Sequence, residues 1–475
     1  MSSVATPVDR EQAPPFDAAF FAPLRAQLRG DLVMPGDPAY DASRSVWNAM
    51  IDRRPAAIAR CLGVADVAAC VSFARDHRLP LSIKGGGHNI AGLAVCDGAL
   101  TIDLSRMRGV WVDPAARVAR AQAGALLGDL DRETQVHGLA AVLGFVSATG
   151  IAGLTLGGGF GYMSRKHGWT CDSVRSFEMV TAEGRVVTAS ETEHPDLFWA
   201  LRGGGGNFGV VTNIEYTVFP TGPEIVGGAI AWPMEFAPDV LDLYRDLVTR
   251  APRECVVVAV LRIAPPAPWL RKEVHGKPIV ALFVCHTGPV AEAEAFTAPI
   301  KAFGTPVGDI LQRRSYVSQQ ALLDATQPSG RRYYWKSDYV PAVTSDLLAR
   351  LRDHATRLPS PHSAIAVFPL DGAPNELPAE HSPMGNRDAK AVVNIQAAWD
   401  QPGDDAMAIE WARTAWNDLR PFSTGGTYIN FQTDDEGADR VRAAYGRNYD
   451  RLVEAKTAWD PGNLFAVNKN IAPRR

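Results

Sequence analysis

A glycine-rich turn that joins one strand to the next most constrains the fold of this chain. The segment Lys84-Gly85-Gly86-Gly87-His88-Asn89 follows the apolar run Leu81-Ser82-Ile83 and precedes another extended segment. Glycines permit positive φ and let backbone N–H groups approach a ligand closely, which suits a pyrophosphate. A Rossmann loop would instead open a helix. The sequence therefore predicts a phosphate cradle between two strands, with the imidazole of His88 beside it.

The composition narrows the possible partners. The chain has 475 residues, of which 46% are apolar, and a net charge of −4. A strongly basic face for nucleic acid or an anionic membrane is not expected from this balance. The chain begins without a signal-peptide pattern and has no apolar run of about eighteen residues. The six cysteines lack metal-type spacing. We expect a cytoplasmic protein with reduced thiols and no metal, nucleic-acid or membrane partner.

The chain divides into four segments that differ in composition and in their predicted pattern of helices and strands. Residues 1–39 are expected to form an N-terminal lead-in. Residues 40–222 carry the glycine clusters and end at Phe219-Pro220-Thr221-Gly222-Pro223. Residues 223–424 alternate strands and helices in a pattern typical of an antiparallel sheet with helices on one face. Residues 425–475 contain one predicted long helix, at about 436–457. The fold class is α+β.

A second glycine cluster contains a misleading motif. Gly204-x-Gly206-x-x-Gly209 satisfies the dinucleotide fingerprint G-x-G-x-x-G. A predicted strand at 210–218 follows it, where that fingerprint requires a helix, and no acidic residue lies at the distance of a ribose contact. A Rossmann site is therefore not expected here.

Several long motifs together resemble the berberine-bridge-enzyme-like flavoproteins of the vanillyl-alcohol-oxidase superfamily. The resemblance spans about residues 45–473 in the right order. The motifs are KGGGHN at 84–89, DGALTIDL at 97–104, GIAGLTLGGGFG at 150–161, LFWALRGGGGNFGVVT at 197–212, YIN at 428–430 and YGRNYDRL at 445–452. It implies a PCMH-type FAD-binding domain of two α/β subdomains, formed by 40–222 and completed by 425–475. Residues 223–424 would be the substrate domain.

The resemblance implies FAD bound covalently through one histidine. In this family the histidine of the first glycine loop, here His88, bonds to the flavin 8α-methyl. A neutral imidazole is a nucleophile, and the bond makes the flavin a stronger oxidant. In an alternative reading His88 only hydrogen-bonds in a turn. The other expected cofactor-binding residues are Lys84, Gly85, Gly86, Gly87, Asn89, Thr149, Gly150, Gly153, Leu154, Gly157, Gly158, Gly161, Tyr162, Val211 and Asn468.

Three positions distinguish this chain within the resemblance. Many relatives bond flavin C6 to a cysteine. That cysteine is absent here, because Val146 occupies its position. In this respect the chain resembles the singly linked bacterial members. Cys171 lies in a different motif and is expected to pack as a small apolar residue. Plant members place a histidine where this chain has Leu154. Thr149 falls where the family places a small residue that controls oxygen access, and its volume resembles that of the valine common in oxidases.

Tyr428 matches the tyrosine that serves as the base in several relatives. Such a base removes a proton while hydride leaves the substrate, and it must lie within hydrogen-bond reach. Asn430 is expected on the same strand face. Lys336, in a segment that resembles part of the family's substrate domain, would lower the pKa of the base or hold an anion. The alternatives are a core tyrosine and a salt-bridged structural lysine. The expected substrate-binding residues are Asn394, Gln396 and Trp399.

The resemblance predicts an oxidase that passes hydride from an alcohol or amine carbon of a small organic substrate to flavin N5 and then to O₂, giving hydrogen peroxide. One alternative is a flavin dehydrogenase or a secondary-metabolite tailoring enzyme that forms a ring or double bond without using O₂ efficiently. A non-catalytic flavin carrier is another. Either a monomer or a homodimer fits the sequence.

Overall fold

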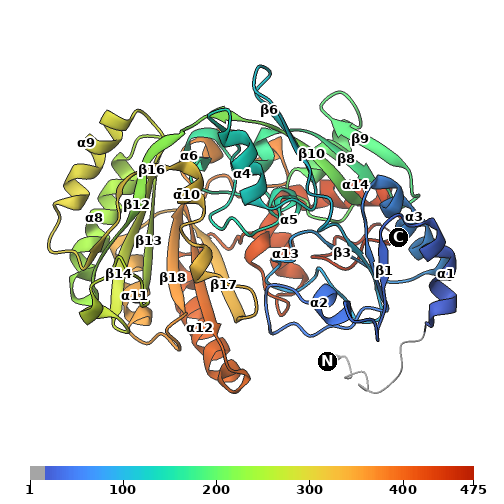
Figure 1. The fold of residues 1–475 in the computed structure, drawn as a ribbon. Helices are drawn as coiled ribbons and strands as arrows, with labels where there is room; N and C mark the ends of the chain where they lie inside the picture. Colours follow the sequence, from blue (N-terminus) through green and yellow to red (C-terminus); the bar gives the residue numbers. More distant parts are fainter. Residues whose placement is uncertain (1–15, 475) are drawn as a thin grey trace.

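A computed structural model describes residues 16–474, and these form two halves that face each other (Figure 1). One half, coloured from blue to green in the figure, carries a four-stranded and a five-stranded sheet. The other half, green to orange, carries an eight-stranded sheet. The C-terminal segment, in red, returns to the first half. This arrangement is the α+β class predicted from the sequence, with an antiparallel sheet covered by helices.

The four-stranded sheet positions the first glycine loop. Its strand order is β1-β2-β4-β3, in which β2, β4 and β3 are parallel and β1 is antiparallel to β2. Helix α3 (Val64–His77) provides the crossover connection from β2 to β3 that strands running in the same direction need. The strands are β1 (Asp31–Val33), β2 (Ala57–Arg60), β3 (Leu81–Lys84) and β4 (Leu100–Asp103), and the remaining helices are α1 (Ala18–Gln27) and α2 (Tyr40–Arg44).

The expected N-terminal lead-in is not loose over its described part. Helix α1 packs on α3 through the rings of Phe20 and Phe73, whose centroids lie 5.5 Å apart. Strand β1 pairs with β2. Residues 16–39 therefore belong to the first half, because an amphipathic helix and a short strand complete its core, whereas residues 1–15 lie outside the described part of the chain.

The five-stranded sheet is antiparallel, in the order β5-β6-β10-β8-β9. Strand β10 follows the Gly204–Gly209 motif directly, which confirms that no Rossmann helix begins there. The strands are β5 (Val110–Asp113), β6 (Val118–Gln122), β8 (Val174–Val180), β9 (Val186–Ser190) and β10 (Val210–Thr217), with the short pair β7 (Leu139–Ala140) and β11 (Phe219–Pro220). The helices are α4 (Leu127–Gln135), α5 (Ile151–Leu156), α6 (Ser164–His167) and α7 (Pro195–Leu201).

The eight-stranded sheet is antiparallel throughout and has two different faces. Helices pack on one face, and the first half packs against the other (Figure 1). Both faces are buried, so its strands read as continuous apolar runs. The strands are β12 (Glu224–Pro233), β13 (Cys255–Ile263), β14 (Pro278–His286), β15 (Gly308–Asp309), β16 (Gln312–Ser315), β17 (Arg332–Val340), β18 (Ala364–Pro369) and β19 (Ala391–Trp399). The helices are α8 (Ala237–Arg250), α9 (Val290–Lys301), α10 (Tyr316–Gln320), α11 (Ser345–Ala355) and α12 (Asp405–Leu419).

The C-terminal segment differs from its prediction in two places. The expected single helix is two helices, α13 (Ala438–Tyr445) and α14 (Tyr449–Trp459). Gly446 ends α13 with a φ of +54°, which favours glycine. Residues Ile429–Phe431 form a 3₁₀ turn where a strand was expected.

A buried ion pair anchors this segment to the second glycine cluster. Lys456 and Asp460 are fully buried, and Lys456 Nζ lies 2.7 Å from Asp460 Oδ2. The same ammonium donates to the carbonyl of Asn207 at 2.8 Å and to that of Phe465 at 3.1 Å. The Asp460 carboxylate also accepts from the backbone N–H groups of Leu464 and Phe465. Both charges are thus compensated, which makes their burial tolerable.

Buried polar contacts also join the two halves. Arg387 donates to Asp172 at 2.5 and 3.0 Å, and both side chains are almost fully buried. Arg165 forms a bidentate pair with Asp371, with both distances 2.9 Å. The side chain of Asn48 bonds to the backbone of strand β17. These contacts fix the orientation of the eight-stranded sheet relative to the glycine loops.

We predict that Lys456→Met lowers the free energy of unfolding by about 3–5 kcal/mol, because it leaves the Asp460 carboxylate buried without its cation. Equilibrium denaturation in urea would measure the change. Arg474→Met, which removes the exposed pair with Glu454 on the same helix, serves as the control and should cost less than about 1 kcal/mol. Equal losses in the two variants would contradict the anchoring role of Lys456.

Candidate active site

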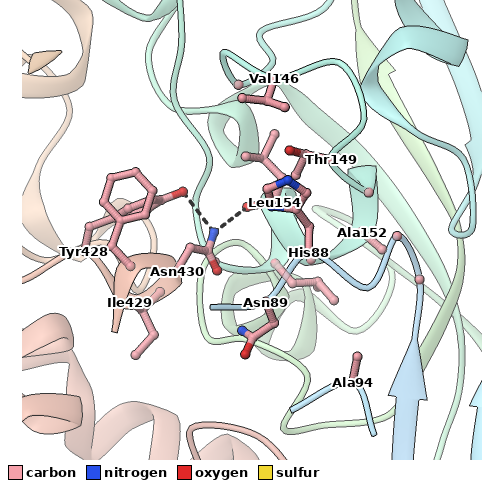
Figure 2. A pocket seen from close by; sticks show the side chains of 18 of the residues that line it. His88, Asn89, Ala94, Val146, Thr149, Ala152, Leu154, Tyr428, Ile429 and Asn430 are labelled. Atoms are coloured by element: carbon pink, nitrogen blue, oxygen red, sulfur yellow. Dashed lines mark hydrogen bonds between the residues drawn. The ribbon is translucent and has the colours of Figure 1, made fainter. Parts of the chain in front are cut away.

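A cavity of about 330 Å³ lies between the two halves and is lined by residues of both. The first half contributes the two glycine loops and residues Gly205–Val211 in part. The eight-stranded sheet contributes side chains of β13, β14, β17, β18 and β19. Residues 428–431 and 467–469 close it from the C-terminal segment. Figure 2 shows His88, Tyr428 and Asn430 gathered around this space.

The floor of the cavity depends on a direct contact between two backbones. A Cβ on Gly86 would lie 2.5 Å from the backbone nitrogen of Gly150, and one on Gly150 would lie 2.5 Å from that of Gly86. Gly87 has a φ of +66°, a conformation that side chains disfavour. Next to this contact, Gly153 has nothing within 4 Å of its Cβ position and lines the cavity. The loops therefore offer bare backbone to a bound group, as expected of a pyrophosphate cradle.

His88 projects into the cavity as a neutral imidazole. Its ring stacks on Trp47 with a centroid distance of 4.2 Å. Its Nε2 atom is buried and has no hydrogen-bond partner among the described residues. Burial lowers the pKa of His88 to about 4. An unpartnered nitrogen with a free lone pair or proton, beside a bare glycine cradle, fits the covalently attached flavin that the sequence predicts.

Most of the expected cofactor residues meet at this cavity, and four do not. The following line it: Gly85, Gly86, Gly87, His88, Asn89, Thr149, Gly150, Gly153, Leu154, Gly157, Val211 and Asn468. Lys84 turns away and donates to the carbonyls of Ser43 and Ser45. Gly158, Gly161 and Tyr162 are absent from the lining.

Gly158, Gly161 and Tyr162 are absent from the cavity lining for one shared reason. All three belong to the segment GGGFGY, which packs partly in the core. A Cβ on Gly158 would meet Met384, and one on Gly161 would lie 1.8 Å from the carbonyl oxygen of Leu143. Tyr162 packs edge-on against Phe145, with centroids 4.8 Å apart, in the interface of the two halves. These residues serve close packing in the structure, and their contact with the cofactor stays a prediction.

Tyr428 and Asn430 form a hydrogen-bonded pair that faces the cavity (Figure 2). Asn430 Nδ2 donates to the Tyr428 hydroxyl at 2.9 Å and to the carbonyl of Leu154 at 3.2 Å. The backbone N–H of Gly159 donates to the same hydroxyl at 3.1 Å. Burial raises the pKa of Tyr428 above its usual 10, and the two donors act in the opposite direction. The site thus holds a phenol whose oxygen already accepts two hydrogen bonds.

Lys336 is outside this site, and the structural alternative holds. It lies on the helix-covered face of β17, where Nζ contacts Asp435 at 3.0 Å and Glu436 at 3.3 Å. It also donates to the hydroxyl of Thr433. Neighbouring residues of a strand point to opposite faces, so Trp335 lines the cavity and Lys336 cannot. The structure therefore places Lys336 away from Tyr428, in the salt-bridged position that the sequence left as the alternative.

The three expected substrate-binding residues, all on β19, likewise lie in different surroundings because neighbouring residues of the strand face opposite sides of the sheet. Gln396 lines the cavity. Asn394 shares its face but is fully buried, and both of its amide atoms lack partners among the described residues. Trp399 is in the core beneath α12, where its Nε1 donates to Asp405 at 2.7 Å. The odd-numbered residues of β19 face the helices, which excludes Trp399 from the substrate site.

Several cavity residues were not singled out in the sequence. Trp335 and Gln327 each present a buried polar atom without a partner among the described residues. Arg262, at the end of β13, and His362, before β18, also line the cavity. Alternation along β13, with Val256, Val258 and Val260 on one face, could have placed Arg262 beside them.

The remaining chemical groups lie outside the cavity. His167 stacks on Phe219 with a centroid distance of 3.8 Å, and Asp172 pairs with Arg387. Cys171 is buried, and burial raises its pKa. Within residues 16–474, no cluster of three His, Cys, Asp or Glu side chains could hold a metal ion. No helix in that range is long and apolar enough to span a membrane.

Comparison with known proteins identifies two matching families. The family described as "FAD binding domain" matches residues 55–190, and "Berberine and berberine like" matches residues 427–472. The first match covers the first glycine loop, and the second covers Tyr428 and Asn430. Both families thus match segments that line the cavity.

Individual relatives match over almost the whole chain. The (R)-6-hydroxynicotine oxidase of Paenarthrobacter nicotinovorans is 32% identical over 94% of this chain and 97% of its own length. An FAD-linked oxidoreductase of Aspergillus terreus is 35% identical over 93% and 94%. The crystal structure of 6-hydroxy-D-nicotine oxidase from Arthrobacter nicotinovorans superimposes with a TM-score of 0.84 at 28% identity, covering 95% of this chain and 99% of that one. The chain belongs to the berberine-bridge-enzyme-like family of FAD-linked oxidoreductases.

Proposed function

We propose that this protein is an FAD-dependent oxidase that removes hydride from an alcohol or amine carbon of a small organic substrate, with O₂ as the final acceptor and hydrogen peroxide as product. The observation that carries the proposal is that the glycine cradle, the unpartnered His88 and the Tyr428–Asn430 pair all open into one cavity. Relatives named as nicotine and xylooligosaccharide oxidases support it. The cytoplasmic location and the oligomeric state stay predictions.

The residues of the cradle would hold FAD, which when bound supplies the hydride acceptor at N5 and the route for electrons to O₂. The bare backbone of the two glycine loops would face its pyrophosphate. His88 would provide a single covalent link, because its neutral ring is nucleophilic and its Nε2 is unpartnered. Val146, which lines the cavity, has no thiol for a second link.

Tyr428 would move the proton. Its hydroxyl oxygen accepts from Asn430 and from the N–H of Gly159, so these donors favour the phenolate. Burial opposes ionisation and keeps the pKa of Tyr428 above its usual value. The phenolate would accept the proton of the substrate O–H or N–H at its oxygen, while Asn430 holds that oxygen in place. Phe160 and Phe431 pack edge-on around the ring, with centroids 5.0 and 4.9 Å away, and exclude water.

We predict that the purified protein keeps flavin fluorescence after acid precipitation and denaturing electrophoresis, and that His88→Ala loses it. Peptide mass spectrometry would locate the flavin on the peptide that contains His88. His167→Ala is the matched control, since burial lowers the pKa of His167 to about 4 as well but its ring stacks on Phe219 outside the cavity. Release of free FAD from the denatured wild-type protein would exclude the covalent bond.

We predict that Tyr428→Phe slows anaerobic flavin reduction by about 100-fold without changing flavin content, the size expected for loss of a general base. Because burial raises the pKa of Tyr428, its proton stays bound to a higher pH. The wild-type reduction rate should therefore rise with pH and show no plateau below pH 10, whereas the variant should be nearly insensitive. Stopped-flow absorbance with the best substrate of an alcohol and amine panel would measure both rates. A variant as fast as wild type would leave Tyr428 as a core residue.

Reaction with oxygen decides between the oxidase and a dehydrogenase or tailoring enzyme. A solved relative of the same fold, a grass pollen allergen at 21% identity with a TM-score of 0.84, is described as having glucose dehydrogenase activity. We propose that Thr149, which lines the cavity, leaves room for oxygen. Its hydroxyl makes no hydrogen bond to the described residues, so valine would be a close substitute.

We predict that Thr149→Val reoxidises within about three-fold of the wild-type rate, whereas Thr149→Ile, with one more methylene, is at least about ten-fold slower. Mixing the reduced protein with aerated buffer in a stopped-flow instrument would give both rates. Slow reoxidation of the wild-type protein itself would replace the oxidase by the dehydrogenase alternative. An equal rate in the isoleucine variant would show that Thr149 does not control oxygen access.

A further inference from the structure

The substrate side of the cavity contains an arginine without a counter-charge. Arg262 is only 9% exposed and lines the cavity. Its Nε donates to the carbonyl of Ile263 at 3.2 Å, and its two terminal nitrogens have no hydrogen-bond partner among the described residues. No carboxylate of those residues pairs with it. A buried guanidinium normally has both an anion and hydrogen-bond acceptors around it. Arg262 lacks the anion, and a negatively charged ligand in the cavity can supply it.

The other charged side chains near Arg262 neutralise one another. Arg331 pairs with Asp400 at 2.9 Å, and the same carboxylate accepts from His362 at 3.0 Å. Burial and Arg331 lower the pKa of Arg262 to about 10, which leaves it charged at neutral pH. Burial and Arg331 also lower the pKa of His362, which keeps that ring neutral. One positive charge therefore remains uncompensated. It matches a single negative charge and repels an ammonium.

The strand register places Arg262 in a row of polar groups across the sheet. Arg262 pairs with Ala364 on β18, Ala364 with Gln396 on β19, and Gln396 with Trp335 on β17. All four residues line the cavity. Trp335 Nε1 is a buried donor without a partner among the described residues. The small side chain of Ala364 leaves the space between the guanidinium and the Gln396 amide open, so an acceptor group there meets donors from both sides.

Between this row and Tyr428, the cavity lining of β13 and β18 is apolar. The next row of the sheet contains Val260 and Ala366, which line the cavity, and Asn394, which is buried and does not line it; the row beyond contains Phe368. Phe368 packs on Phe160, which in turn packs on Tyr428. Phe368 is four residues along β18 from Ala364, roughly 13 Å at the rise of a strand. The polar row and the proposed base thus lie at opposite ends of the apolar lining that Val260, Ala366 and Phe368 form.

We propose that Arg262 binds the carboxylate of the substrate, and that the substrate is a monocarboxylic acid with a flat apolar body whose reacting carbon lies at the Tyr428 end. The proposal rests on the proposed function for the reacting end and on Arg262 for the anionic end. A planar carboxylate can accept two parallel hydrogen bonds from the terminal nitrogens. A phosphate dianion would leave one negative charge unbalanced, and an amine substrate without an acid group would meet a like charge.

Equilibrium binding of simple acids to the flavin-loaded protein tests this assignment. The probes are benzoate and 3-phenylpropionate, each compared with its neutral amide, and isothermal titration calorimetry gives the dissociation constants. We expect at least one acid to bind about ten- to hundred-fold more tightly than its amide, as a charge-assisted hydrogen-bonded pair would provide. Arg262→Gln should abolish this preference, and Arg262→Lys should retain part of it.

Arg313→Gln is the matched control, because Arg313 lies on β16 of the same sheet but is exposed and paired with Glu294. It should bind the acids as the wild type does. An acid preference that is absent in the wild type, or unchanged in Arg262→Gln while thermal melting shows a folded protein, would overturn the proposal. Loss of acid binding in Arg313→Gln would also overturn it, since a general surface field would then be responsible.

The same samples separate this proposal from the proposed function. A protein whose flavin is not reduced by any hydroxy or amino acid, yet which binds acids in an Arg262-dependent way, would refute the oxidase and support the carboxylate site. A protein whose flavin is reduced by neutral alcohols or amines as well as by their acid analogues would support the oxidase and refute the role of Arg262. Calorimetry reports the first property and anaerobic flavin absorbance the second.

Discussion

The contact between Gly86 and Gly150 is the constraint on which the site depends. Two loops from different parts of the first half approach so closely that neither position has room for a Cβ. The first loop is fixed by the parallel strands β3 and β4, and the second leads into α5. Their contact leaves backbone, rather than side chains, on the surface of the cavity. His88 lies two residues after Gly86, so the same turn that forms the contact also places the imidazole ring in the cavity.

Much of the architecture could be predicted because the local pattern decides it. The alternation of strands and helices expected over residues 223–424 is found in the structure, where β12, β13, β14, β18 and β19 are each a short apolar run bounded by turns. The strand after Gly209 was likewise correct, and it excluded a nucleotide helix. The C-terminal helix was wrong because a continuous apolar stripe hid the break at Gly446, where only the backbone conformation marks the end of α13.

The residues of the site were harder to predict because the sequence does not tell which face of a doubly buried strand meets the cavity. Lys336 and Trp335 are neighbours, and only the packing of α12 shows that the lysine faces the helices. The same ambiguity misplaced Trp399 and concealed Arg262. Tyr428 and Asn430 were found through a motif, although the expected strand geometry was replaced by a 3₁₀ turn that brings their polar atoms within 2.9 Å.

The ion pairs that join the halves have a consequence for how molecules enter and leave. Swinging the eight-stranded sheet away from the glycine loops would separate Arg387 from Asp172 and Arg165 from Asp371, and would break the charge-assisted hydrogen bonds of both pairs. A hinge motion that separates the two halves is therefore unfavourable in free energy. Substrate and product would then enter and leave while the two halves keep this arrangement, and turnover would not depend on how fast solvent viscosity lets the halves move.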